Sequence, residues 1–262
     1  MDCIILAGGV PAQDDLLYEY TQGGPKALIP LAGKPMVQWI VDVLTAVERI
    51  DRILMVGLGP DDGVTSAKLA AFIPDRGSML RNVIAGVDRL LELSPGTRQV
   101  VICSTDIPLI TVEIVNRYLD ECAGADYDIY YGAVERSRME GRFPNSRRSY
   151  VHLTDGDYAG ADIFVVNPEI AYTNRQMWDD LMGSRKSVLK QARLIGLGTL
   201  LRLLLRRLSL KEAEVRVLRA LGLTGRVVKI ADAELGMDVD KPFQLEICRQ
   251  ELEAASRGGG AS

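Results

Sequence analysis

Short apolar runs alternate along much of the chain with longer segments of helical periodicity. The runs predict strands, and the longer segments predict helices between them. Strands are expected at residues 3–7, 52–57, 99–104, 127–133, 162–166 and 227–230, and helices at residues 36–47, 64–72, 80–93 and 112–122. This order is typical of an α/β fold with three layers: a mostly parallel sheet, Rossmann-like, with helices on both faces. In such sheets ligands bind beyond the carboxyl ends of the strands.

The pattern changes in the second half. Residues 177–222 look almost wholly helical and predict a helical insertion. Leu197, Leu201, Leu204 and Leu208 follow one another at helical spacing and form a stripe, expected to pack in the core or against a second subunit. A final helix is expected over residues 242–254. We interpret residues 1–254 as one domain, with a nucleotide-binding half at 1–125, an acceptor half at 126–254 and a disordered tail at 255–262.

Composition narrows the class of protein. Of 262 residues, 47% are hydrophobic and 25% charged, which is typical of a soluble globular protein. A net charge of −4 gives no general positive field for nucleic acid. The first apolar run is short and has no basic residue before it, and arginines interrupt the apolar stretch at 192–210, so neither predicts a signal peptide or a transmembrane segment. The expected location is cytoplasmic.

The cysteines and the histidine of this sequence do not form the patterns that are typical of redox or metal sites. The four cysteines lie far apart with no CxxC pair, and they predict buried thiols that pack in the core. His152 is the single histidine, and it lies in a strand-like segment, which argues against a histidine-based metal site. Catalysis in this chain would therefore depend on carboxylates, lysines or arginines.

A glycine pair follows the first predicted strand. In the loop Leu6-Ala7-Gly8-Gly9 the missing Cβ atoms let backbone N–H groups approach an anion, although such a pair is also typical of a plain turn. The segment PKALIPLAGKPM at residues 25–36 then places Lys26 as a counter-charge for phosphate. Its Gly-Lys-Pro turn leads into a helix, which proline can begin.

These two segments resemble the signature of the nucleotidyltransferases with a GT-A-like fold. That group includes the molybdopterin guanylyltransferase-like, sugar-phosphate nucleotidyltransferase and methylerythritol-phosphate cytidylyltransferase families. Three later segments resemble further family motifs in the expected order: STDIPL at 104–109, GADIFVV at 160–166 and GMDVDKP at 236–242. The resemblance implies transfer of a nucleoside monophosphate from an NTP to a phosphorylated small-molecule acceptor. Pyrophosphate would be released, Mg²⁺ would be the cofactor, and no nucleic acid would be needed.

The resemblance also implies roles for single residues. The implied roles are catalysis for Lys26 and Asp106; nucleotide binding for Leu6, Ala7, Gly8, Gly9, Lys26, Asn82 and Thr105; acceptor binding for Gly160 and Asp162; and metal binding for Asp106, Asp240 and Asp238. Arg142 is a further candidate for acceptor binding because guanidinium groups bind phosphate. Carboxylates suit Mg²⁺, and the reaction needs positioning and charge neutralisation rather than a nucleophilic side chain. Asp238 and Asp240 alternate along an extended segment, so we expect only one of them, preferably Asp240, to reach the metal.

Other interpretations stay open for several of these residues. Asp106 could cap a helix or an Asx turn, and Asn82 could be an exposed polar residue of a helix. The basic run that contains Arg142, with Arg136, Arg138, Arg147 and Arg148, could be a solvated loop.

The sequence departs from the better-known family members in one respect. No arginine lies between Gly9 and Lys26, and the segment carries Asp14, Asp15 and Glu19 instead. The β- and γ-phosphate contacts would then fall to Lys26, Lys34 and Arg81. Alternative functions are a GT-A glycosyltransferase that uses a nucleotide sugar, or a non-catalytic nucleotide-binding regulator. An interfacial helix at the leucine stripe would place such a regulator on a membrane. The base, the acceptor and a homodimeric state are left open.

Overall fold

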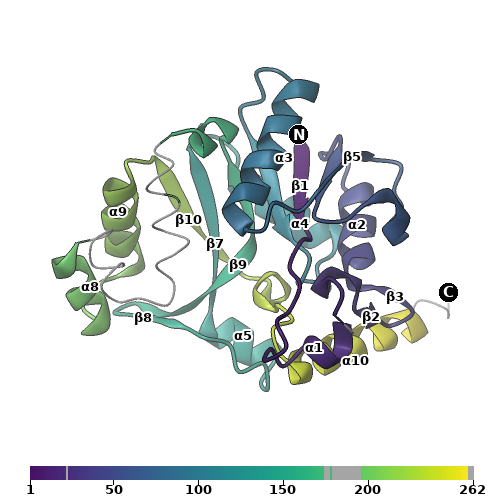
Figure 1. The fold of residues 1–262 in the computed structure, drawn as a ribbon. Helices are drawn as coiled ribbons and strands as arrows, with labels where there is room; N and C mark the ends of the chain where they lie inside the picture. Colours follow the sequence, from purple (N-terminus) through teal and green to yellow (C-terminus); the bar gives the residue numbers. More distant parts are fainter. Residues whose placement is uncertain (22, 174–177, 179–195, 259–262) are drawn as a thin grey trace.

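A mixed sheet forms the centre of the computed structural model, which describes residues 1–21, 23–173, 178 and 196–258. The strands run in the order β10-β7-β9-β6-β1-β4-β5, and β8 pairs with β9 (Figure 1). Their bounds are β1 Asp2–Leu6, β4 Ile53–Val56, β5 Leu69–Ile73, β6 Val100–Ser104, β7 Ile129–Glu135, β8 Val151–Leu153, β9 Gly156–Val166 and β10 Gly225–Ile230, with a separate hairpin of β2 Pro30–Leu31 and β3 Lys34–Pro35.

The sheet has a parallel region, built by the first half of the chain, and a mixed region, built by the second half. In the first half β1 lies parallel to β4 and β6, and β4 lies parallel to β5. In the second half β9 runs antiparallel to both β6 and β7, while β10 is parallel to β7. The long strand β9 therefore joins the two halves into one sheet.

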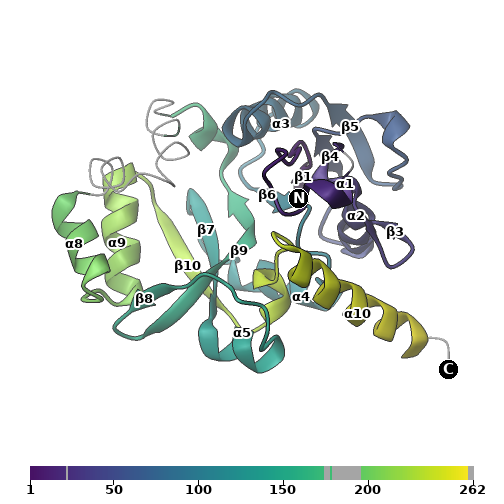
Figure 2. The ribbon, with the colours of Figure 1, turned by 60° about the horizontal axis from the view of Figure 1, so that its bottom comes forward.

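Helices cover both faces of this sheet. The helices are α1 Tyr18–Thr21, α2 Met36–Ala46, α3 Met79–Leu93, α4 Val112–Glu121, α5 Arg136–Arg142, α8 Leu197–Leu204, α9 Leu210–Leu221 and α10 Pro242–Gly258. Alternate residues of β1 separate the two cores: Ile4 is buried in the same cluster as α3, whereas Cys3 and Ile5 are buried with α2, α4 and α10. This arrangement confirms the predicted α/β fold with three layers (Figure 2).

The predicted helix at 64–72 is wrong. Residues 69–73 form β5, the edge strand beside β4, and the connection before it contains only a short 3₁₀ turn at Pro60–Asp62. Leu69, Phe72 and Ile73 have the spacing of one helical face, but the run is too short for periodicity to separate a helix from a strand. Partial burial on both sides of the edge strand explains why apolar residues occur without clean alternation.

The described part of the predicted helical insertion contains two helices with a break between them. Arg206 adopts a positive φ of 54° after α8, and Ser209 begins α9 through a capping box with Glu212. The break splits the leucine stripe. Leu208 is fully buried, whereas Leu197, Leu201 and Leu204 are exposed. The prediction that the stripe packs in the core is therefore wrong for these three residues. Residues 177 and 179–195 lie outside the described residues.

Two smaller expectations concern the cysteines and the end of the chain. All four cysteines are buried and free, as expected for packing thiols. Helix α10 extends to Gly258, so the tail predicted from residue 255 is wrong for 255–258. Residues 259–262 lie outside the described residues.

Within the described part of the chain, no helix combines the length and the apolar character needed to cross a bilayer.

Candidate active site

The glycine loop lies at the carboxyl end of β1, where two backbones meet. The Ala7 N–H donates to the Val56 carbonyl oxygen at 2.7 Å, which holds the loop against the end of β4. Gly57 follows β4 with a φ of +101°, and a Cβ atom on it would overlap the backbone of Gly8. The position therefore requires glycine both for its conformation and for the close approach.

Replacing Gly57 with alanine is expected to lower the free energy of unfolding by about 2–4 kcal/mol, because strain and backbone overlap add together. Gly63→Ala is the matched control. Gly63 also has a positive φ of 75°, but nothing lies within 4 Å of its added Cβ. Urea denaturation of both variants measures the difference. An equal loss of stability in the two variants would show that the Gly57–Gly8 approach has no special cost.

Lys26 joins the glycine loop to two carboxylates. Its backbone N–H donates to the Gly9 carbonyl oxygen at 2.8 Å. Its Nζ lies 2.8 Å from Asp106 Oδ2 and 2.8 Å from Asp240 Oδ1. Burial alone would lower the pKa of Lys26, but the two carboxylates outweigh burial and raise its pKa above the ordinary value. Lys26 is therefore a fixed cation between two acids from distant parts of the sequence.

Backbone contacts bring these two acids together. Asp106 lies just beyond β6, and Ser104 Oγ donates to Asp106 Oδ1 at 2.5 Å. The Val239 N–H donates to the Asp106 carbonyl oxygen at 2.8 Å, which anchors the segment before α10 beside the end of β6. Thr111, and not Asp106, caps α4. The Asp106 side chain is thus available to face Lys26.

The neighbouring acids of this segment have different partners. Asp240 contacts Lys26, whereas Asp238 is buried in an ion pair with Arg148. An extended segment sends alternate side chains to opposite sides, which accounts for the difference. Asp240 and not Asp238 therefore shares a cation with Asp106.

A third carboxylate interacts electrostatically with Asp106. Asp162 comes from β9, and its pKa is raised to about 7 by burial first and then by the negative charge of Asp106. Arg148 acts in the opposite direction and favours the charged form of Asp162. Two residues before Asp162, a Cβ atom on Gly160 would overlap the hydroxyl group of Tyr131. Glycine at 160 leaves room for the Tyr131 hydroxyl group beside β9.

The structure places Arg148 at this site and gives Arg142 a different role. Arg142 Nε lies 3.1 Å from Glu234, and its guanidinium also pairs with Glu251 of α10, so the described contacts do not bring it to the acid cluster. Arg148 Nη2 lies 3.5 Å from the Gly160 carbonyl oxygen, and its Nε is buried without a hydrogen-bond partner in the described part of the chain. Sequence reasoning missed Arg148 because five arginines in one run look alike until burial separates them.

The predicted base-recognition residue lies against the glycine loop. Asn82 is buried, which excludes an exposed helix position. Its Nδ2 donates to Asp75 Oδ1 at 2.7 Å, and its Oδ1 accepts the Arg76 N–H at 2.7 Å. A Cβ atom on Gly8 would overlap Asp75 Oδ1, so Asp75 lies over the loop. Asn82 therefore holds the exposed Asp75 carboxylate in place, and sequence reasoning had not selected Asp75.

The remaining predicted residues fall nearby or elsewhere. Ala7 and Thr105 are buried at the ends of β1 and β6, and Leu6 is partly buried. Lys34 pairs with Asp42 and lies over the Trp39 ring, so it supports α2. Arg81, in the first turn of α3, makes no ion pair with any described residue.

The carboxylates suit a Mg²⁺ ion that is completed by substrate. The described residues contain no ready group of three or more His, Cys, Asp or Glu side chains for a metal. Mg²⁺ commonly binds through one or two carboxylates together with phosphate oxygens and waters. Asp106 and Asp240, which both contact the Lys26 ammonium, show that a cation is held between them. This pair fits a shared Mg²⁺–triphosphate site.

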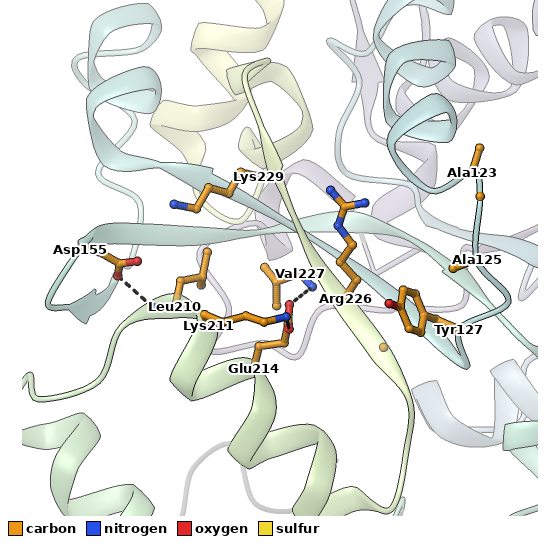
Figure 3. A pocket seen from close by; sticks show the side chains of 12 residues that line it. Ala123, Ala125, Tyr127, Asp155, Leu210, Lys211, Glu214, Arg226, Val227 and Lys229 are labelled. Atoms are coloured by element: carbon orange, nitrogen blue, oxygen red, sulfur yellow. Dashed lines mark hydrogen bonds and ion pairs between the residues drawn. The ribbon is translucent and has the colours of Figure 1, made fainter.

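A separate hollow of about 520 Å³ lies between α9, β10 and the loop before β7 (Figure 3). Glu214 accepts the Val227 N–H at 2.7 Å and pairs with Lys211 across its floor. Arg226 and Lys229 project from β10 beside it. None of the predicted site residues lines this hollow, so it does not belong to the acid cluster.

Known proteins resemble this chain in sequence and in fold. The model of the MobA-like NTP transferase domain matches residues 3–193. A solved structure described as a hypothetical transferase from Thermus thermophilus is 34% identical, covers 94% of this chain and 100% of its own, and has a TM-score of 0.79. No curated protein matches the sequence.

Two further structures share the fold. CMP:2-keto-3-deoxy-manno-octonic acid synthetase complexed with CTP is 15% identical, with a TM-score of 0.59 and coverage of 97% of this chain and 98% of that one. The 4-diphosphocytidyl-2C-methyl-D-erythritol synthase from Anaerococcus prevotii is 12% identical, with a TM-score of 0.56 and coverage of 96% and 95%. The family match favours nucleotidyl transfer over the glycosyltransferase and regulator alternatives. With its glycine loop, its Lys26 and its ordered motifs, the chain belongs to the MobA-like NTP transferase family of nucleotidyltransferase enzymes.

Proposed function

We propose that the protein transfers a nucleoside monophosphate from an NTP to a phosphorylated small molecule, with Mg²⁺ and with release of pyrophosphate. The observation that carries this proposal is the contact of Lys26 with both Asp106 and Asp240 beside the glycine loop. One cation and two acids, next to the backbone N–H groups of the glycine loop, form a place where a triphosphate and its metal can be held together. The acceptor and the metal requirement are the parts of the proposal that experiment must establish.

In the proposed reaction an anionic oxygen of the acceptor attacks the α-phosphorus of the NTP. A new P–O bond forms as the bond between the α-phosphorus and the bridging oxygen breaks, and pyrophosphate carries away the electron pair. Mg²⁺, when bound by Asp106 and Asp240, would neutralise charge on the phosphates. The Lys26 ammonium would turn from the carboxylates to the phosphate oxygens. Each group positions or neutralises, and none forms a covalent intermediate.

The acceptor would bind on the β9 side of the site. Arg148 is fixed there by Asp238, and its Nε has no hydrogen-bond partner among the residues that the structure describes. A guanidinium that is held in place and not fully bonded is suited to an anionic group such as a phosphate. Arg148 therefore replaces Arg142 as the candidate for acceptor recognition.

The test is pyrophosphate release from each of the four NTPs with Mg²⁺, against a panel of sugar, polyol and cofactor phosphates. One NTP with one acceptor should release pyrophosphate in an amount equal to the nucleotide–acceptor conjugate formed. The same mixture with EDTA should be inactive. Conjugate formation that continues at full rate in EDTA would contradict the metal requirement. Binding of a nucleotide sugar but of no NTP would contradict nucleotidyl transfer.

We propose further that the base is guanine, because an exposed carboxylate lies over the glycine loop. A carboxylate only accepts hydrogen bonds, and guanine presents two adjacent donors, N1–H and the N2 amino group. GTP should therefore be preferred over each other NTP by about tenfold to a hundredfold.

Asp75→Asn should reduce this preference for GTP. The control is Asp61→Asn, which alters an exposed acid in the connection after β4 and should leave the preference unchanged. Comparing kcat/KM for the four NTPs measures the effect. An unchanged preference in Asp75→Asn would exclude Asp75 as the base-reading residue.

A further inference from the structure

Helix α8 exposes a group of leucines although one of its sides is buried. Leu200 and Thr199 face the body of the protein and are buried. The leucine face, which we define by its exposed members, comprises Leu197, Leu201, Leu204 and Leu205, with exposed fractions of 72%, 53%, 64% and 53%. Soluble proteins seldom gather large apolar side chains in this way unless the surface has a partner.

Arginines border the leucine face. Arg202, Arg206 and Arg207 are exposed and make no ion pair with any residue that the structure describes. The acid that interacts electrostatically with Arg202 is Glu212, whose carboxylate also accepts the Ser209 N–H at the start of α9. The whole chain has a net charge of −4, so this border is locally opposite in sign to the protein as a whole.

The backbone after α8 fixes the position of the arginines. The Arg207 N–H donates to the Arg202 carbonyl oxygen at 2.7 Å, and the Arg206 N–H donates to the Leu203 carbonyl oxygen at 2.9 Å. This pair of bonds is a Schellman motif, in which the residue at the Arg206 position is left-handed and is usually glycine. An arginine in this conformation places a cation where glycine would be the less strained choice.

We propose that the leucine face of α8 and its arginine border dock the protein on an anionic phospholipid surface. The leucines would enter the boundary between head groups and acyl chains, and the arginines would bind lipid phosphates. Figures 1 and 2 both show α8 at an outer end of the molecule, away from α2 and α3, where it can approach a planar surface.

Charge argues against a second copy of the chain as the partner. A two-fold dimer brings the same patch of each subunit together, so the arginine borders of the two copies would lie opposite one another. Such like-charge pairs oppose association. An anionic bilayer has the opposite charge and accepts apolar side chains at the same time.

The experiment is flotation of the full chain with vesicles made of equal parts phosphatidylglycerol and phosphatidylcholine, compared with vesicles of phosphatidylcholine alone. The bound fraction should be about tenfold higher on the anionic vesicles and should fall as salt is added. The double variant Leu201→Ser with Leu204→Ser should lose binding. Arg206→Ser with Arg207→Ser should weaken binding to anionic vesicles only. All of these side chains are exposed, and circular dichroism checks that the variants keep the fold.

Matched controls test the same chemical changes elsewhere on the surface. Leu16→Ser and Arg98→Ser alter exposed residues far along the chain from α8 and should leave the bound fraction unchanged. The proposal is overturned if the protein does not float with anionic vesicles, or if the leucine variants float as well as the parent. Analytical ultracentrifugation tests the alternative partner, a second copy of the chain. If the parent is a dimer and the leucine variants are monomers, the leucine face is a dimer interface.

Discussion

Replacing Asp106 with asparagine is expected to lower kcat by about a hundredfold to a thousandfold while the protein stays folded. The amide has nearly the same shape. Its one oxygen can still accept the hydrogen bond from Lys26, and its NH2 group can donate to the Ser104 hydroxyl oxygen in place of the second bond. It lacks the negative charge that would hold Mg²⁺ against the triphosphate, and removing a charge-stabilising group of this kind typically costs that much. Pyrophosphate release at saturating NTP measures the change, and raising the Mg²⁺ concentration should recover part of the loss.

Asp126→Asn provides the control for this prediction. Asp126 is an exposed acid in the loop before β7, and its partner Arg98 is also exposed. Its substitution should leave kcat unaltered. If Asp106→Asn retained the parent rate at every Mg²⁺ concentration, Asp106 would have no part in holding the metal.

Replacing Lys26 with methionine is expected to have two effects of opposite kind. The variant should lose about a hundredfold in kcat/KM for the NTP, because the cation that would contact the phosphates is gone. It should also bind Mg²⁺ more tightly in the absence of nucleotide, because no ammonium competes for Asp106 and Asp240. Kinetics and isothermal titration with Mg²⁺ measure the two effects separately.

The same variant should show a stability defect that metal repairs. Without Lys26 the two acids face each other unpaired, and the free energy of unfolding should fall by about 1–3 kcal/mol in metal-free buffer. Urea denaturation with Mg²⁺ should recover most of this loss. Lys34→Met removes a lysine with a different carboxylate partner, Asp42, and should show no recovery. A Lys26→Met variant whose Mg²⁺ affinity and stability match the parent would contradict the arrangement of these charges.

Most of the sheet could be predicted because its central strands are buried on both faces. Continuous apolar runs such as the one in β6 have few other interpretations in a chain of this composition. The edge strand β5 was mistaken for a helix because partial burial removes both the continuous run and the clean alternation. The break between α8 and α9 depends on a left-handed arginine, which no sequence rule favours at that position.

Sequence reasoning could name the site residues that lie in family motifs. It could not name the residues whose place at the site depends on tertiary contacts and burial. Lys26, Asp106 and Asp240 meet through backbone contacts beyond β1 and β6: the Lys26 N–H donates to the Gly9 carbonyl oxygen, and the Val239 N–H donates to the Asp106 carbonyl oxygen. Arg148 differs from Arg142 only in its surroundings: one is buried beside Asp238, and the other pairs with acids near and on α10. Asp75 is held over the glycine loop by a hydrogen bond from Asn82 of α3. The spacing of residues in the sequence does not reveal this contact between a loop and a helix.

The bond from the Val239 N–H to the Asp106 carbonyl oxygen has a consequence for synthesis of the protein. Residues 1–104 contain β1, β4, β5 and β6 of the main sheet, but Asp240 and α10 come near the end of the chain. Because synthesis runs from the N-terminus and a domain generally folds as a unit, the glycine loop and Lys26 are made before their second acid exists. The proposed triphosphate site would then be completed late, after the acceptor half has been made. A nascent chain would have no complete metal site with which to consume NTP before it could hold an acceptor.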